Sequence, residues 1–289
     1  MARQSVVLAY HAVGPAPAGT RLPATFLPPA EFERQMNYLA RHRRVVPLSE
    51  LWCADHGGPI RVAITFDDGY RSVLTQAAPI LERHGFSATL FVPTRWLGDR
   101  NRWDGEDCPG LELMTEKELV QLAGRGFEIA SHGHRHIDMS TATREAVRED
   151  IQASIQRISA LVGGPPLHLS YPYGRSSEVA REVVRECGFA EAFALEWEDR
   201  QFARSRTPVF PADTGWRFAF KSSGRYAPFR RSRPVVAVYE RVRRYRAALD
   251  LRSGIGVRSR PQPAQAGPEP RTPRESAGTP PEPLTGRGR

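Results

Sequence analysis

Short apolar runs alternate with longer stretches of helical period from residue 6 to about residue 195. This alternation is typical of a parallel sheet whose strands are connected by helices. The expected strands are 6–10, 61–66, 88–93, 127–130, 167–170 and 190–195. The expected helices are 29–41, 73–84, 115–125, 144–162 and 178–187. The pattern therefore predicts an α/β fold that forms one domain over residues 1–250.

The regular alternation fades after residue 195. A basic amphipathic stretch at about 235–251 predicts a helix whose apolar side docks on the domain. Its arginines form a solvated face or contact anionic lipid. The last stretch, 251–289, is rich in Pro, Gly, Arg and Ser and cannot bury a core, so we expect a disordered tail.

The net charge of +9 is shared between the tail and the domain. The tail holds seven Arg against three Glu, which is +4, so the domain is only modestly basic. No nucleic-acid motif accompanies this charge, and we expect no nucleic-acid partner. The chain is expected to act as a monomer.

Cysteine usage and apolar runs bear on the cellular compartment. The three cysteines lack a C-x-x-C pattern, so neither a disulfide framework nor a cysteine metal site is expected. The apolar run at residues 6–9 is too short for a signal peptide, and no stretch is long enough for a membrane span. We expect a cytoplasmic protein, associated at most with the cytosolic face of the membrane through the basic helix.

Polar residues follow four of the predicted strands directly. His11 follows the first strand, Asp67 and Asp68 the second, and His132 the strand 127–130, while the turn 171–174 follows the strand 167–170. The carboxyl ends of parallel strands are where α/β barrels build their active sites. The sequence thus places its unusual residues on one rim.

The stretch S-H-G-H-R-H, residues 131–136, contains two histidines four positions apart. One helical turn would bring His132 and His136 to the same side, where a metal such as zinc accepts two nitrogens, and His134 would point elsewhere. A His-rich polar loop without a ligand is the alternative interpretation.

Asp68 completes a three-ligand set with the two histidines. Two imidazoles and one carboxylate leave a fourth position open, as in catalytic zinc sites, although cobalt, nickel and iron also accept these ligands. Asp67, next to Asp68, can take a proton from water near the metal.

Three ordered motifs carry a family resemblance. T-F-D-D-G (65–69), S-H-x-x-x-H (131–136) and Y-P-Y-G (171–174) resemble the first motifs of the polysaccharide deacetylase family, also called the NodB-homology domain or carbohydrate esterase family 4. The resemblance runs from residue 6 to about residue 246. It implies a distorted (β/α) barrel that removes acetyl groups from N-acetylated sugars with one divalent metal.

The resemblance also implies residue roles. Asp68, His132 and His136 would hold the metal, and Asp67 would be the general base. The backbone N–H of Tyr173 would contact the oxyanion.

Three departures from the family pattern are visible. Ser170 stands where the family carries an arginine that orients the base, and Arg175 and Arg206 are both candidates to replace it. D-T-G-W (213–216) is the best match to a fourth motif, with Asp213 and Trp216 near the acetyl pocket. An ordinary turn followed by a core aromatic is the alternative there.

The third departure concerns the proton donor. No histidine follows His168, although the family places its acid histidine near the C-terminus. A branch acting on exopolysaccharides is similar in carrying an N-terminal Y-H-x-V, with the acid histidine moved to the front of the chain by circular permutation. The Y-H-A-V at 10–13 therefore makes His11 the expected general acid. Trp103, in a long loop, stacks on a sugar ring or packs within the loop.

These features predict a metal-dependent N-deacetylase of an N-acetylated sugar in a polysaccharide, oligosaccharide or glycolipid precursor. One alternative is a hydrolase of the same fold acting on a non-sugar amide. The other is a catalytically silent carbohydrate-binding module without metal.

Overall fold

A parallel sheet that curls almost into a barrel forms the centre of the molecule. The computed structural model describes residues 5–53, 58–107, 110–196 and 199–231. Within these residues the sheet has nine strands. They are β1 (Val6–Tyr10), β4 (Arg44–Val45), β5 (Arg61–Phe66), β6 (Thr89–Val92), β7 (Glu128–Ser131), β8 (His168–Ser170), β9 (Glu191–Ala194), β10 (Arg204–Ser205) and β11 (Thr207–Pro208). The short strands β2 (Ala12–Val13) and β3 (Phe26–Leu27) form a separate pair.

The two edges of this sheet are consecutive in sequence. The strands follow the order β10-β9-β8-β7-β6-β5-β1-β11, with β4 pairing β5 outside this path. Only Arg206 separates β10 from β11, and its backbone N–H donates to the carbonyl of Ala194 at 2.9 Å. Segment 204–208 therefore spans the gap between β9 and β1 and nearly closes the barrel. The predicted strands include no counterpart to this segment.

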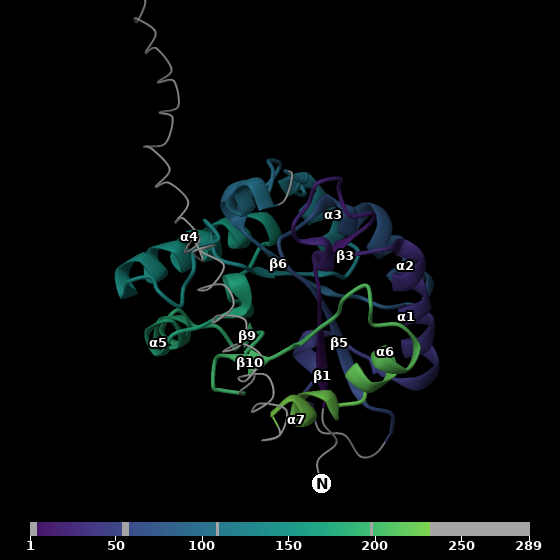
Figure 1. The fold of residues 1–289 in the computed structure, drawn as a ribbon. Helices are drawn as coiled ribbons and strands as arrows, with labels where there is room; N and C mark the ends of the chain where they lie inside the picture. Colours follow the sequence, from purple (N-terminus) through teal and green to yellow (C-terminus); the bar gives the residue numbers. More distant parts are fainter. Residues whose placement is uncertain (1–4, 54–57, 108–109, 197–198, 232–289) are drawn as a thin grey trace, which may run out of the picture.

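Helices cover the outside of the barrel. They are α1 (Pro29–His42), α2 (Ala78–Arg83), α3 (Glu116–Ala123), α4 (Arg144–Val162), α5 (Glu178–Glu186), α6 (Gly215–Lys221) and α7 (Tyr226–Arg231). In Figure 1, α1 and α2 lie on one side of the strands and α4 and α5 on the other. Local signals set the ends of these helices: Thr115 and Glu118 form the predicted capping box of α3, and Gly163 ends α4 with φ 82°.

Most predicted elements have observed counterparts. The predicted strands 6–10 and 61–66 and the predicted helix 144–162 match β1, β5 and α4 residue for residue. The predicted helix 73–84 begins as a π-helical turn, Val73–Ala77, before α2. Helices α6 and α7 have no counterpart among the predicted helices.

Side chains inside the barrel form layers, because alternate residues of each strand face inward. At the base, Thr89 Oγ1 donates to Glu128 at 2.7 Å, and His168 Nδ1 lies 2.5 Å from the other oxygen of Glu128. The middle layer is apolar and includes Val7, Ala63, Phe91, Ala130 and Phe193. The polar side chains of Thr65, Ser170 and Arg206 lie above it, toward the carboxyl ends of the strands.

The basic helix predicted at about 235–251 and the tail predicted at 251–289 lie outside the described residues, as does the end of the predicted domain. Among the helices that the structure describes, none combines the length and the apolar character that crossing a bilayer requires.

Candidate active site

The predicted site residues meet at one rim of the barrel. His11 follows β1, Asp67 and Asp68 follow β5, His132 follows β7, and the turn 171–174 follows β8. Because β1, β5, β6, β7 and β8 pair side by side in parallel, their carboxyl ends lie on the same edge. The topology therefore brings together residues that are far apart in sequence.

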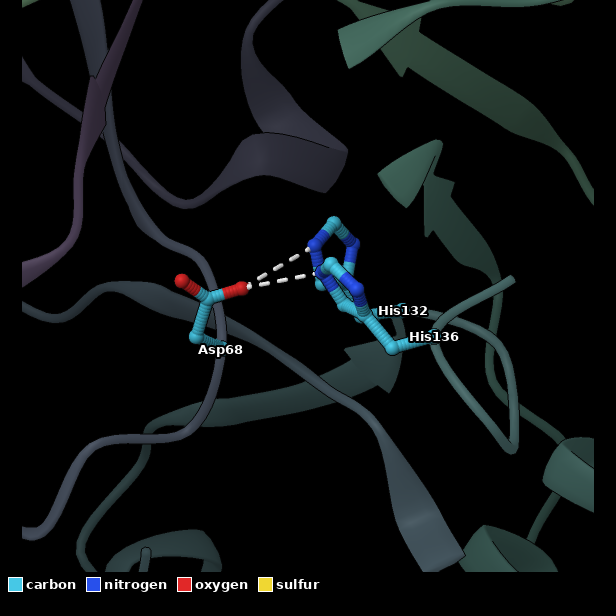
Figure 2. A group of neighbouring side chains, drawn as sticks. All are labelled: Asp68, His132 and His136. Atoms are coloured by element: carbon cyan, nitrogen blue, oxygen red, sulfur yellow. Dashed lines mark ion pairs between the residues drawn. The ribbon is translucent and has the colours of Figure 1, made fainter. Parts of the chain in front are cut away.

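Asp68, His132 and His136 form one cluster whose potential ligand atoms all lie within 4.8 Å of one another. Oδ1 of Asp68 is 3.3 Å from Nε2 of His132 and 3.4 Å from Nε2 of His136. Figure 2 shows both imidazoles facing the same carboxylate oxygen. All three residues are buried, with 7%, 2% and 4% of their surface exposed.

The spacing of these three atoms fits a metal ion. Charge-assisted hydrogen bonds between nitrogen and a carboxylate are usually about 2.7–2.9 Å long, shorter than the two separations here. Tetrahedral ligands about 2.0–2.1 Å from a zinc ion are roughly 3.3–3.4 Å apart. Nδ1 of His132 lies 2.8 Å from the carbonyl oxygen of Ser170, which only accepts, so Nδ1 carries the hydrogen and Nε2 keeps its lone pair. The donor set and its tautomer are those that a divalent metal requires.

Backbone strain is concentrated at this cluster. Four described non-glycine residues have a positive φ, and three belong to the rim: Asp68 (71°), His136 (61°) and Tyr173 (60°). L-residues rarely adopt this conformation, and such strain tends to persist where surrounding contacts over-determine it. Gly69 continues the turn with φ 69°, which glycine adopts without cost.

The two histidines converge from a loop, so the helical turn inferred from their spacing is wrong. Residues 132–136 follow β7 without any helix, and Gly133 turns the chain with φ 75°. His134 points elsewhere, as predicted: its Nδ1 lies 2.9 Å from Thr94 Oγ1, and it is absent from the ligand cluster.

Asp150 anchors this loop from α4, although the sequence analysis did not identify it. Its carboxylate accepts from the backbone N–H groups of His134 (2.7 Å) and Arg135 (2.9 Å) and from Arg135 Nε (3.1 Å). A Cβ on Gly133 would lie 2.5 Å from Asp150 Oδ2, so only glycine fits there. A signal was present, because Asp150 is a charged residue on the buried face of α4, next to Ile151.

Asp67 lies in a separate polar network closed by Arg206. The Arg206 guanidinium donates to both carboxylate oxygens, at 2.8 and 2.6 Å, and also to Ser170 Oγ (2.7 Å) and Thr65 Oγ1 (3.0 Å). The structure therefore selects Arg206 between the two candidate arginines. Arg175 pairs with Asp138.

Burial and charge act in opposite directions on the acids of the site. Burial alone would raise the pKa of Asp67, but the Arg206 guanidinium holds that pKa below its ordinary value. Burial would also raise the pKa of Asp68, yet the two facing imidazoles hold it well below the ordinary value. Both carboxylates are therefore ionised at neutral pH.

The two histidines of the cluster respond differently. Burial would lower the pKa of His132, but the Asp68 and Asp67 carboxylates leave it raised. Burial dominates at His136 and lowers its pKa.

His11 reaches the Asp67 side of the site. Its Nε2 is 3.9 Å from Oδ2 of Asp67, and 23% of its side chain is exposed. It thus stands between the buried carboxylate and solvent.

The three predicted substrate-binding residues lie in different environments. Trp103 is 9% exposed and stacks on the His136 ring. Asp213 is buried, pairs with Lys221 at 2.5 Å and accepts from the backbone N–H of Phe210. Trp216 begins α6 and is 74% exposed. The Asp213 carboxylate therefore has structural partners, whereas the Trp216 side chain is open to solvent.

Sequence comparisons show that this chain is similar to polysaccharide deacetylases. Residues 55–192 match the model of the family described as Polysaccharide deacetylase. YxkH of Bacillus subtilis (strain 168), which is named for the same family, is 25% identical over 222 residues, covering 73% of this chain and 74% of YxkH. The poly-β-1,6-N-acetyl-D-glucosamine N-deacetylase of Staphylococcus aureus (strain MRSA252) is 26% identical over 180 residues. That match covers 58% of this chain and 60% of the staphylococcal protein, less than two thirds of its length.

Solved structures share the fold. The Streptococcus pyogenes deacetylase PplD in complex with acetate superposes with a TM-score of 0.64 at 16% identity, covering 76% of this chain and 98% of that one. IcaB from Ammonifex degensii gives a TM-score of 0.64 at 22% identity, with 76% and 97% covered. These likenesses confirm the predicted (β/α) barrel. Over residues 55–192 the sequence is similar to the polysaccharide deacetylase family.

Proposed function

We propose that this protein is a metal-dependent hydrolase that removes the acetyl group from an N-acetylated sugar in a polysaccharide, oligosaccharide or glycolipid precursor. One observation carries the proposal: two adjacent buried carboxylates have different partners. Asp67 pairs with the guanidinium of Arg206, whereas Asp68 faces two imidazoles. The staphylococcal relative, named as a deacetylase of a poly-N-acetylglucosamine, supports an N-acetylhexosamine substrate.

Asp68, His132 and His136 are the residues that would hold the metal. A divalent cation bound there supplies Lewis acidity toward the amide carbonyl and the attacking water. Zinc suits this donor set best, and cobalt, nickel and iron accept it as well.

Asp67 is assigned the role of general base. Each of its oxygens accepts one hydrogen bond from Arg206 and keeps a further lone pair, so the carboxylate can take a proton from the attacking water. Arg206 fixes the orientation of the carboxylate and keeps it ionised.

Two further groups act on the tetrahedral intermediate. The turn at Tyr173 lies next to His136, with ring centroids 4.8 Å apart, and its backbone N–H is assigned to the developing oxyanion. His11 is assigned as general acid, giving its proton to the amine nitrogen as the carbon–nitrogen bond breaks. The products are acetate and the free amino sugar.

The test combines metal analysis with product detection. Purified protein loaded with zinc or cobalt is incubated with β-1,6-linked N-acetylglucosamine oligomers, with other N-acetylhexosamine oligomers and with a small acetamide that carries no sugar. We expect one metal per chain, and acetate and free amine in equal amounts from the glycans. His136→Ala should abolish stoichiometric metal binding, whereas His134→Ala should bind metal nearly normally.

Release from the small acetamide alone would favour the non-sugar amidase. Stoichiometric metal without acetate from any substrate would contradict the proposed hydrolysis, and failure to bind metal would contradict the proposed site.

A further inference from the structure

The ring of His136 is held in an unusual way for a metal ligand. Its Nδ1 is buried and has no hydrogen-bond partner in the described part of the chain. Metal-ligating histidines almost always donate their second ring N–H to an oxygen, which fixes the plane of the ring. His132 follows that rule through the carbonyl of Ser170. The contacts observed on the other sides of the His136 ring are packing contacts with aromatic rings.

Aromatic rings occupy the surroundings of His136. Trp103 stacks on its face, with centroids 4.5 Å apart and planes inclined by 21°. Tyr173 and His132 approach in edge-on geometry at 4.8 and 4.9 Å. Of these contacts, only that of Trp103 is face to face, and such a contact fixes the plane of the imidazole.

Trp103 is itself held firmly. It is 9% exposed and packs in a cluster with Phe26, Tyr70 and Leu113. The neighbouring Asn101 is 1% exposed, and its amide closes the loop by accepting from the backbone N–H of Leu111 and donating to Asp104.

The loop is also tied to the acidic turn. The backbone N–H of Met114 donates to the carbonyl of Gly69 at 2.9 Å, immediately after Asp68. The loop that presents Trp103 is therefore fixed relative to both sides of the ligand cluster.

We propose that Trp103 is a positioning residue of the metal site, whose indole holds the His136 ring so that Nε2 faces Asp68, in place of the missing hydrogen bond. The inference rests on the proposed metal site and extends it. It also gives Trp103 a role other than sugar stacking. The positive φ of His136 makes this support more important, because a strained backbone does not by itself fix the side chain.

The test measures metal affinity by competition with a chromophoric chelator, using zinc and cobalt. Trp103→Leu keeps apolar bulk but removes the stacking face, and we expect it to weaken affinity about 10–100-fold, the usual cost of losing a partner that orients a metal ligand. Trp103→Phe keeps a smaller face and should recover part of the loss. Trp52→Leu is the matched control. Trp52 stacks on Phe193, a residue of the apolar layer away from the rim, so the metal affinity of Trp52→Leu should equal that of wild type.

The outcomes separate the hypothesis of the metal site from the hypothesis that Trp103 positions His136. Wild-type protein that binds no stoichiometric metal would refute the proposed site itself. Wild-type protein that binds metal, with folded Trp103→Leu binding it equally tightly, would refute the role of Trp103 alone.

A second measurement decides the matter if Trp103→Leu does not fold. Fluorinated tryptophan keeps the shape of the indole and weakens its π face. Its incorporation should lower metal affinity in wild type and leave Trp103→Phe unchanged. Equal affinities with and without fluorine in wild type would overturn the inference.

Discussion

The Asp67 side and the Asp68 side of the site differ although the two residues are adjacent. Both oxygens of Asp67 accept hydrogen bonds from Arg206, which also donates to Ser170 and Thr65, so this carboxylate belongs to a buried hydrogen-bond network. Asp68 directs one oxygen at two imidazoles, at distances that leave room for an ion. The positive φ of Asp68 turns the chain between the two environments.

The difference shows that the partner, more than the residue type, decides what a buried carboxylate can do. Arginine stays protonated at any pH of interest, so a guanidinium keeps the carboxylate that it pairs with ionised at neutral pH. An imidazole that keeps its Nε2 lone pair, as the hydrogen bond from His132 Nδ1 to Ser170 favours, leaves the charge of Asp68 available to a metal. The following predictions test whether the two sides are separable.

The largest effect is expected from Asp68→Asn, which removes the anionic ligand without changing the shape of the side chain. Stoichiometric metal and all acetate release should be lost together. Asp67→Asn is the matched control: it should keep the metal and lower kcat by about 10²–10⁴-fold, the usual range for a general base. Metal content and kcat are measured for both variants. Loss of metal from Asp67→Asn would show that the Asp67 and Asp68 sides of the site are not separable.

A smaller effect is expected from His11→Ala, which should keep fold and metal but lower kcat by about 10²–10⁴-fold. The proton donor must be protonated to act, so the wild-type pH–rate profile should fall on its alkaline side as the donor loses its proton. His11→Ala should flatten that limb. Near-normal turnover with an unchanged profile would assign the proton to another group.

Arg206→Met should act on stability as well as on activity. Removing one partner of a buried ion pair leaves the other charge unpaired, and the typical cost is about 3–5 kcal/mol. In Asp67→Leu/Arg206→Met the free energy of unfolding should recover substantially while activity remains absent. Urea unfolding gives the free energy of unfolding of both variants. If Arg206→Met proves as stable as wild type, the network does not contribute to stability as proposed.

The same pair predicts a pH dependence. The pKa of Asp67 is lower in the folded protein than in the unfolded chain, where it is about 3.9. The stabilisation is therefore fully present above about pH 4 and is lost as the pH falls through the folded-state pKa. The difference in stability between wild type and Arg206→Met should shrink over that acid range.

The smallest effect is expected from deleting residues 253–289, which contain too few apolar residues to build a core. Melting temperature, metal content and kcat should stay at the wild-type values. A large drop in melting temperature would show that this segment packs on the domain.

The sequence predicted the strands that carry the proposed metal ligands better than it predicted the contacts between those strands. Long runs such as 61–66 and 144–162 have one clear period, and the structure matches them at both ends. The segment 204–208 gave no such signal, because it is five residues long and contains Pro208, which weakens a strand assignment. Arg206 could therefore be proposed as the partner of Asp67 but not chosen over Arg175.

The histidine loop teaches a related lesson. The spacing of four residues suggested a helical turn. Instead, the positive φ values of Gly133 and His136, and the Asp150 carboxylate that anchors the loop, bring the two imidazoles together. These depend on tertiary contacts that sequence periodicity does not carry.

Closure of the barrel by segment 204–208 also implies an order of assembly. Arg206 and Asp67 are 139 positions apart, and such long-range contacts form only after the intervening chain has been ordered. All three proposed metal ligands precede Arg206, so they leave the ribosome before it. The pair between Asp67 and Arg206 can therefore form only after the three proposed ligands have been synthesised, when the last strand of the sheet is in place.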